Sequence, residues 1–312
     1  MSKTQWPQLD YKEWKDSLDT LALFTQIVGK IRLRSLPWLN HSWHVTLYVS
    51  PRGLTTGAMQ YADGIFEIEF DFVQHVLLVT TSTGFLEKMP LHSISVAHFY
   101  TTLFNILDEA GIAVSIYPVP NELETAIPFK QDDIHKTYNK EQVHTYWQAL
   151  VQVYKVFTRF RTGFRGKGSP VHLFWGAFDL VVTRFSGRPA PPHPGGAPHM
   201  PLRVMQEAYS HEVSSCGFWP GNDAFPQAAF YSYCYPAPAG FSEQEIKPKE
   251  AFYNKEMGEY FLLYDVVRTS ADPAATLLQF LQTTYEAAAN TGEWDRPALE
   301  CDLTSFEYRF VL

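Results

Sequence analysis

The sequence predicts an α+β protein made of two pseudo-equivalent halves, in which antiparallel sheet packs against helices. Three observations indicate this fold class. Apolar residues recur with helical spacing in some stretches, they alternate with polar residues in others, and one helix-and-strand pattern occurs twice. We expect a first half at 1–120, a connection at 121–140, and a second half at 141–312 with a loop insertion, rich in Pro and Gly, at 186–221.

The first half is expected to begin with a helix, because apolar residues recur at steps of three and four over 14–31. Alternation of apolar and polar residues then predicts strands of an antiparallel meander. These strands are expected at 45–49, 66–72 and 76–79. Within the meander, Glu67 and Glu69 resemble an acid/base pair, but the polar face of a sheet explains them more simply.

A second helix of the first half is expected at 96–110, with Ser95 as its N-terminal cap and Gly111 at its end. The segment 112–119 predicts one more strand before two prolines close it. The polar, charged stretch that follows is the best candidate for a connection between the halves.

The second half repeats the same order of elements. A helix is expected over 143–157, and a later one begins where Asp272 caps the chain before Pro273 and runs to about Asn290. The expected strands of this half lie at 173–182, 228–235, 259–267 and 306–312.

Part of the sequence pattern recurs after a shift of 133 residues, which superposes Trp14 on Trp147 and Pro37 on Pro170. Shortly after each proline, a cluster of His and Trp residues leads into a predicted strand, at 40–44 and at 172–175. A long coincidence of spacing is harder to produce by composition than a single match. We therefore predict an internal duplication.

The composition excludes several classes of protein. With 46% hydrophobic and 15% aromatic residues, the chain is not typical of disorder, and its net charge of −8 argues against a nucleic-acid partner. We expect no membrane association, because no apolar run approaches the length of about 20 residues that a spanning helix needs. The three cysteines have no zinc-like or redox-like spacing, so we expect a reducing, cytoplasmic location.

The segment 186–201 holds six Pro and three Gly in sixteen residues, so it cannot form a helix or an interior strand. A flexible linker is one interpretation. A stiff loop laid over the protein is favoured, because the segment interrupts a half whose strands must still pair, and long ordered loops are often functional.

Side chains around this loop are the candidates for a site. Arg184 and Arg188 would hold an anion, since the guanidinium fork suits carboxylate or phosphate. His193 and His211 are the acid/base candidates, because histidine titrates near neutrality, and Glu212 follows as a catalytic candidate. These side chains are expected to converge beneath the loop.

Four further residues are candidates for ligand binding. His44 and His172 lie near equivalent positions of the two halves and would face one cleft. Tyr231 and Tyr233 alternate along a predicted strand, and their hydroxyls would either line a pocket or pack under a helix. No metal ligand is assigned, because no ligand motif with a known spacing is present, although four histidines with Glu212 and Asp179 leave a His/carboxylate metal site as an alternative.

The chain resembles a bacterial family known only as domain of unknown function 5996. The resemblance covers the chain from Trp6 to about Trp294 and implies one compact unit, but no activity, cofactor or ligand. It rests on the motifs Thr25-Gln-Ile-Val-Gly-Lys30, Pro37-Trp-Leu-Asn-His-Ser-Trp-His44, Arg52-Gly-Leu-Thr55, Phe66-Glu-Ile-Glu-Phe-Asp71, Ser169-Pro-Val-His-Leu-Phe-Trp-Gly176, Ser186-Gly-Arg188, Pro191-Pro-His-Pro-Gly-Gly196 and Tyr209-Ser-His-Glu-Val-Ser-Ser215.

From these residues we expect a protein that binds a small anionic or polar molecule in a cleft between its halves, under the Pro-rich loop. A hydrolase-like or transferase-like reaction with His acid/base chemistry is one form of this function. The alternatives are a metal-dependent enzyme and a non-catalytic protein that binds or self-associates, in which case the loop would contact a second subunit of a homo-oligomer. The sequence identifies no cofactor.

Overall fold

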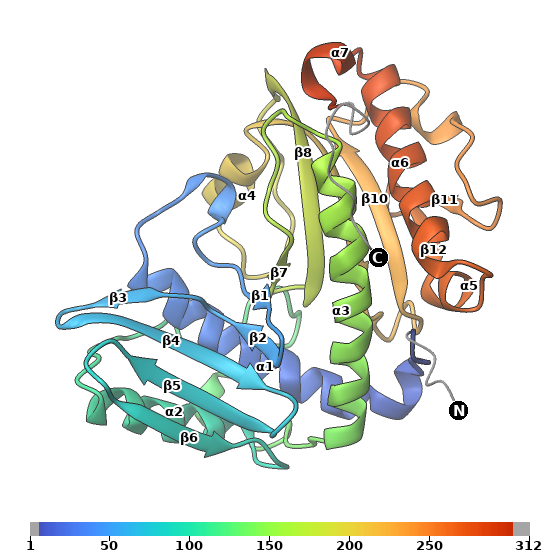
Figure 1. The fold of residues 1–312 in the computed structure, drawn as a ribbon. Helices are drawn as coiled ribbons and strands as arrows, with labels where there is room; N and C mark the ends of the chain where they lie inside the picture. Colours follow the sequence, from blue (N-terminus) through green and yellow to red (C-terminus); the bar gives the residue numbers. More distant parts are fainter. Residues whose placement is uncertain (1–5, 302–312) are drawn as a thin grey trace.

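The computed structural model describes residues 6–301 and shows two antiparallel sheets of six strands each, with helices packed against them (Figure 1). The α+β class with two sheet-containing halves is therefore confirmed. The strand expected at 306–312 lies outside the described residues.

The first sheet belongs to the first half of the chain. Its strands are in the order β1-β2-β4-β5-β6, and β3 pairs with β4. The elements of this half are α1 (Tyr11–Ser35), the 3-10 helix η1 (Asn40–Ser42), β1 (Tyr48–Val49), β2 (Gly53–Thr55), β3 (Met59–Tyr61), β4 (Gly64–Asp71), β5 (Val76–Thr81), β6 (Leu86–Pro90) and α2 (Val96–Glu109).

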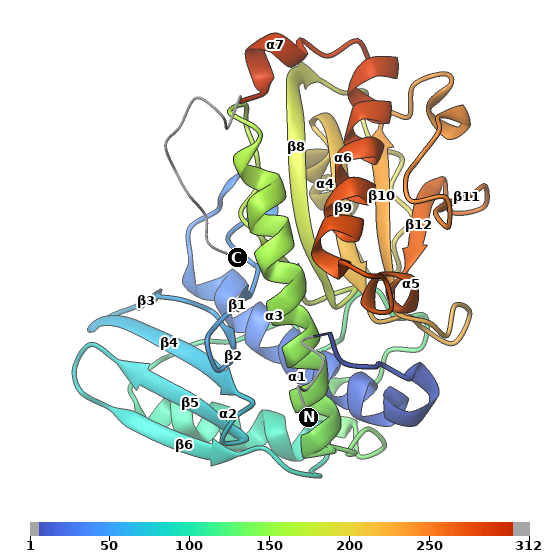
Figure 2. The same cartoon turned by 45° about the vertical axis from the view of Figure 1, so that its right-hand side comes forward.

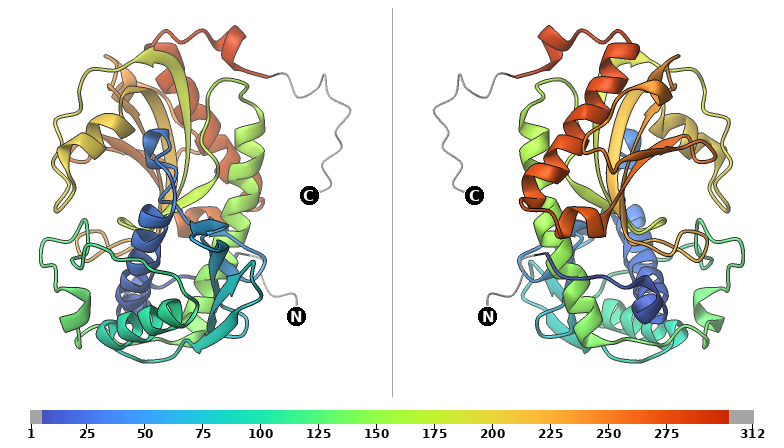
Figure 3. Two further views of the ribbon diagram at one scale, coloured as in Figure 1. Left: turned by 90° about the vertical axis from the view of Figure 1, so that its left-hand side faces the viewer. Right: turned by 90° about the vertical axis from the view of Figure 1, so that its right-hand side faces the viewer.

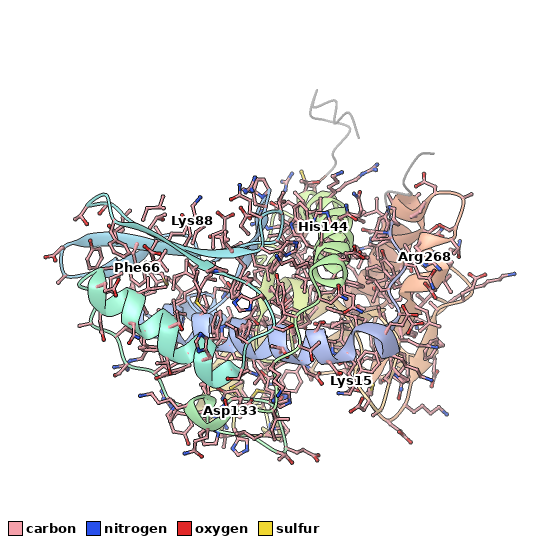
Figure 4. The ribbon with its side chains drawn as sticks, turned by 90° about the horizontal axis from the view of Figure 1, so that it is seen from below. Lys15, Phe66, Lys88, Asp133, His144 and Arg268 are labelled. Atoms are coloured by element: carbon pink, nitrogen blue, oxygen red, sulfur yellow. The ribbon has the colours of Figure 1, made fainter. Side chains whose placement is uncertain are left out.

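One face of the first sheet is apolar and packs on α1 and α2. Phe24 of α1 stacks on Phe99 of α2 with ring centroids 4.0 Å apart, and Phe66 of β4 lies between the sheet and α2, whereas Lys88 points away (Figure 4). On the other face, Glu69 accepts a hydrogen bond of 2.6 Å from Ser50, and Glu67 accepts one from Thr55. The alternation in β4 thus separates the core from a polar face.

The prediction of a strand at 112–119 is wrong, because the structure has no strand between α2 and the 3-10 helix η2 (Phe129–Gln131). The alternation itself is real, since Ile112 is buried and Val114 and Ile116 pack against the core. A strand needs a partner strand for its backbone groups, and no described strand pairs with this segment.

The second sheet belongs to the second half and has the strand order β11-β12-β10-β9-β8-β7. The range 186–221, expected to be a loop insertion, contains the end of β8, α4 and β9, and the expectation that 186–201 forms no interior strand is wrong for 186–189. The Pro-rich loop therefore covers only residues 190–201. The elements of this half are α3 (Lys140–Thr162), β7 (His172–Phe174), β8 (Asp179–Pro189), α4 (Leu202–Ala208), β9 (His211–Trp219), β10 (Ala229–Tyr235), the 3-10 helix η3 (Phe241–Glu243), β11 (Phe252–Asn254), β12 (Glu259–Leu263), α5 (Tyr264–Arg268), α6 (Pro273–Thr291) and α7 (Arg296–Leu299).

Two expected strands of this half are wrong in extent. The strand predicted at 173–182 is a hairpin, in which β7 pairs with β8 and Phe178 takes a left-handed backbone conformation in the connecting turn. The strand predicted at 259–267 ends at Leu263, because Leu263 pairs with Ala229, where β10 begins, and the chain continues as α5.

Different helices pack on the two faces of the second sheet. Helices α3 and α6 pack on one face, here called the helix face, and α4 lies on the other, here called the outer face (Figures 2 and 3). Each half thus runs from a long helix through antiparallel strands to a second helix. The internal duplication itself stays a prediction.

The two sheets meet at one backbone contact. Leu47 and Leu173 exchange two hydrogen bonds of 2.9 and 2.8 Å, so β1 lies beside β7. Trp175 strengthens this junction, since its indole N–H donates to the Val45 carbonyl at 2.7 Å. Helix α1 passes close to the Trp175 ring at Gly29, where a Cβ atom would lie only 2.1 Å from ring atoms.

We predict that Gly29→Ala destabilises the protein by about 1–3 kcal/mol, because the added methyl group forces α1 and the Trp175 ring apart. Urea unfolding measures this change. Gly163→Ala is the matched control, since a Cβ at Gly163 meets its nearest neighbour at an ordinary 3.6 Å. Equal stability of Gly29→Ala and the unmodified chain would show that the junction does not depend on this contact.

Candidate functional site

Polar side chains gather on the outer face of the second sheet. Directly opposite residues of neighbouring strands point to the same face. Tyr231 of β10 lies opposite Gly217 of β9, which lies opposite Val181 of β8. Two residues along, and so on the same face, Thr183 and Ser215 hydrogen-bond through their hydroxyls at 2.8 Å.

Tyr231 crosses β9 to reach β8. Its hydroxyl donates a hydrogen bond to the carboxylate of Asp179. The ring has room because Gly217 lies beneath it, where a Cβ atom would come within 2.3 Å of the Tyr231 hydroxyl. The glycine is therefore required for the tyrosine to reach the acid.

The Pro-rich loop, residues 190–201, is anchored to tyrosines of this face. Tyr235 donates a hydrogen bond of 3.0 Å to the Pro191 carbonyl, and the His193 ring stacks on Tyr209 at 4.5 Å. The hydroxyls of Tyr209 and Tyr233 are hydrogen-bonded at 2.7 Å. The loop thus lies against the same side chains that line the face.

The connection between the halves contributes a second covering segment. The backbone N–H of Glu122 donates to the Pro198 carbonyl at 2.9 Å, so the connection and the Pro-rich loop are joined. Asn121 donates to the His199 carbonyl and accepts a hydrogen bond from Lys30 of α1. The site is therefore built from both halves of the chain.

We call the central group of side chains on this face the acidic tyrosine cluster. Its acids come from the connection, β8 and β12, and its phenols come from the end of α4 and from β10. The members are Glu122, Asp179, Tyr209, Tyr231, Tyr233 and Glu259. All are partly exposed except Asp179, which is buried.

The three acids of the cluster have raised pKa values. Burial raises the pKa of Glu122 and of Glu259 to about 7, and the charge of Asp179 raises both further in the same direction. Burial also raises the pKa of Asp179 to about 6, against the hydrogen bond from Tyr231, which lowers it. Among the described residues, no basic side chain lowers the pKa of any of the three.

This arrangement supports two kinds of chemistry. Carboxyl groups that titrate near neutrality can accept or donate protons at the pH of the cell. When ionised, they form a negative site with aromatic walls, which suits a cation. No three His, Cys, Asp or Glu side chains of residues 6–301 are arranged to hold a metal ion.

Arg184 lies on the helix face, away from the cluster. Its guanidinium packs 3.6 Å from the centroid of the Phe160 ring and 4.3 Å from that of Tyr285. It also donates to the Phe160 carbonyl, and burial lowers its pKa to about 10. The side chain is therefore buried between α3 and α6.

Arg188 binds the end of a helix. Its Nη2 pairs with Glu212 at 2.7 Å, and its guanidinium donates to the carbonyls of Gly292 and Glu293, just after α6. Basic side chains commonly satisfy the last carbonyls of a helix in this way. The Arg188–Glu212 pair thus holds β8 and β9 against α6.

His211 belongs to a separate group around η1. Its ring lies 5.9 Å from that of His41, which contacts the Ala208 carbonyl and Lys167. The four predicted residues therefore do not converge. Arg184 lies on the helix face, and Arg188 binds Glu212. His193 stacks on Tyr209, and His211 lies beside His41.

His44 and His172 are both buried at the junction of the sheets. The charge of Arg32 lowers the pKa of each, in addition to the effect of burial, and the pKa of His172 falls to about 3. The structure therefore brings these two side chains into the neighbourhood of Arg32. Tyr231 and Tyr233 lie in the acidic tyrosine cluster.

Sequence reasoning missed three members of the cluster, Glu122, Tyr209 and Glu259, and it considered Asp179 only as a ligand of the alternative metal site. The stripe of alternating tyrosines in β10 was the one signal that pointed to this face. Asp179 and Glu259 each begin a strand, but only the pairing order of the strands shows that their side chains share the face of Tyr231.

A family of unknown function (DUF5996) matches residues 6–301, and the chain belongs to this family. No curated protein matches the chain, and no solved structure matches it either. None of the helices within residues 6–301 combines the length and the apolar character needed to cross a bilayer.

The raised pKa values predict how stability depends on pH. Since Glu122 and Glu259 hold their protons more tightly when folded, the contribution of these two groups to the free energy of unfolding falls as the pH rises from 4.5 to about 7. The double variant Glu122→Gln, Glu259→Gln should lose this fall and gain about 1–3 kcal/mol at the upper end.

Urea unfolding at both ends of this pH range measures the effect. Glu67→Gln is the control, because Glu67 lies on the polar face of the other sheet. An identical pH profile for the double variant and the unmodified chain would contradict the prediction.

Proposed function

We propose that this protein binds a small polar molecule bearing a quaternary ammonium or amine group, and that the acidic tyrosine cluster is the binding site. The molecule would lie on the outer face of the second sheet, beside the Pro-rich loop and the connection. The observation that supports this most strongly is the group of three acids without a basic partner among the described residues.

The charge of the cluster favours a cation. Three neighbouring carboxylates repel one another, and partial burial makes each costly to ionise. A bound ammonium group would offset both effects, because it supplies the opposite charge that the protein itself lacks there. An anion would add to the repulsion.

The phenol rings favour the same class of ligand. Tyr231 and Tyr233 stack with ring centroids 6.1 Å apart, and Tyr209 lies 6.2 Å from Tyr233. Grouped aromatic rings attract quaternary ammonium groups through their negative faces. Their hydroxyls provide donors and acceptors for the polar remainder of the ligand.

The expectation of an anionic ligand rested on Arg184 and Arg188. Both guanidinium groups contact protein groups, the first among aromatic rings and the second at Glu212 and the end of α6. We therefore still expect a small polar ligand, but one that carries a positive charge instead of a negative one.

Choline is a suitable probe, and calorimetric titration measures its binding. We expect saturable binding that strengthens as the pH rises from about 6 to about 7, because the acids then ionise. Glu259→Gln should weaken binding roughly tenfold, the effect of losing about 1.4 kcal/mol of attraction.

Two controls make this test specific. Glu67→Gln changes the net charge equally at a distant face and should leave choline binding intact. The neutral isostere 3,3-dimethyl-1-butanol has the shape of choline without its charge and should bind far more weakly. Equal binding of the two probes, or no effect of Glu259→Gln, would disprove the proposal.

A further inference from the structure

A buried arginine lies at the junction of the two sheets without an acidic partner. Arg32, in the last turn of α1, is only 6% exposed. Its guanidinium lies 5.2 Å from the centroid of the Tyr48 ring. Its Nε atom has no hydrogen-bond partner within residues 6–301. A buried cation in this state is costly unless an opposite charge accompanies it.

A second orphaned side chain lies beside it. His172 of β7 is completely buried, and in the described part of the chain neither of its ring nitrogens has a hydrogen-bond partner. The positive charge of Arg32 lowers the pKa of the His172 imidazole. A neutral imidazole carries one N–H, so this ring has an unused donor as well as an unused acceptor.

The backbone pairing places these side chains together. Leu47 and Leu173 are direct partners in the antiparallel contact between the sheets. Because the contact is antiparallel, Tyr48 and His172 are the residues that follow this isolated bridge on the same side, so we infer that they are neighbours. The Arg32 guanidinium lies over the Tyr48 ring.

Space is available next to the guanidinium. A Cβ atom built at Gly57, which is partly exposed, would meet only one atom within 4 Å, namely Nη1 of Arg32 at 3.9 Å. The space beside Gly57 therefore leads to the charged end of Arg32. A small solute beside Gly57 would therefore contact Nη1 of Arg32.

We propose that Arg32 and His172 bind a small inorganic anion of the halide class at the junction of the two sheets. The anion accepts hydrogen bonds from the guanidinium and the imidazole N–H, and it neutralises the buried positive charge. This site is separate from the acidic tyrosine cluster, so it does not depend on the function proposed for that cluster. Its role is to stabilise the contact between the halves.

Bromide tests the proposal in the unmodified full chain. Crystals grown in sodium bromide should show an anomalous peak within hydrogen-bond distance of Arg32 Nε or of His172. In solution, the melting temperature should rise with sodium bromide by more than with sodium gluconate at the same ionic strength, because a bound ligand stabilises the folded state. Gluconate is a much larger organic anion than bromide and serves as the control for ionic strength.

Variants separate this site from a general effect of salt. Arg32→Met should weaken the apparent bromide affinity at least roughly tenfold. Arg184→Met is the matched control, since Arg184 is also buried but contacts aromatic rings and a carbonyl, and it should keep the bromide response. His172→Phe serves as a second variant if Arg32→Met does not fold.

Two results would overturn the proposal. One is an ordered water molecule, with no anomalous signal, at Arg32 and His172 in the bromide crystals. The other is an equal rise in melting temperature with bromide and gluconate, which would indicate salt screening alone.

Discussion

The contact between Leu47 and Leu173 is the constraint on which the rest of the structure depends. Two backbone hydrogen bonds join β1 to β7 and so align the sheet of the first half with that of the second. Trp175 adds an indole hydrogen bond and a close contact with Gly29 of α1. Because α1 is fixed there, Lys30 lies over the ring of Trp175 in the second half, and the charge of Arg32 lowers the pKa of His172.

Burial of charge distinguishes the two sites on this frame. At the acidic tyrosine cluster, partial burial makes three acids hold their protons near neutrality, and mutual repulsion adds to the effect. At the junction, burial acts on a guanidinium that cannot lose its proton in practice, so an anion is needed instead. The same physical cost thus leads to a titratable site in one place and a counter-ion site in the other.

Much of the fold could be predicted from the sequence, because helical spacing at 14–31 and alternation at 66–72 report burial directly. The segment 112–119 shows the limit, since alternation reports which side is buried but not whether a partner strand exists.

The site was less predictable from the sequence than the fold. Arg184 and His193 are close in sequence but lie on opposite faces of one sheet, and Glu122 reaches Asp179 only through the path of the connection. Such proximity depends on strand order and register, which local patterns do not contain.

The hydrogen bond between Glu122 and Pro198 has a consequence for how the outer face is covered. Two stretches from different parts of the chain form a single layer, and Asn121 ties that layer to α1 through Lys30. A shortened Pro-rich loop would thereby release the connection as well, and a change in the connection would loosen the loop. Neither segment can be shortened independently of the other, because the two together form the layer that covers the outer face.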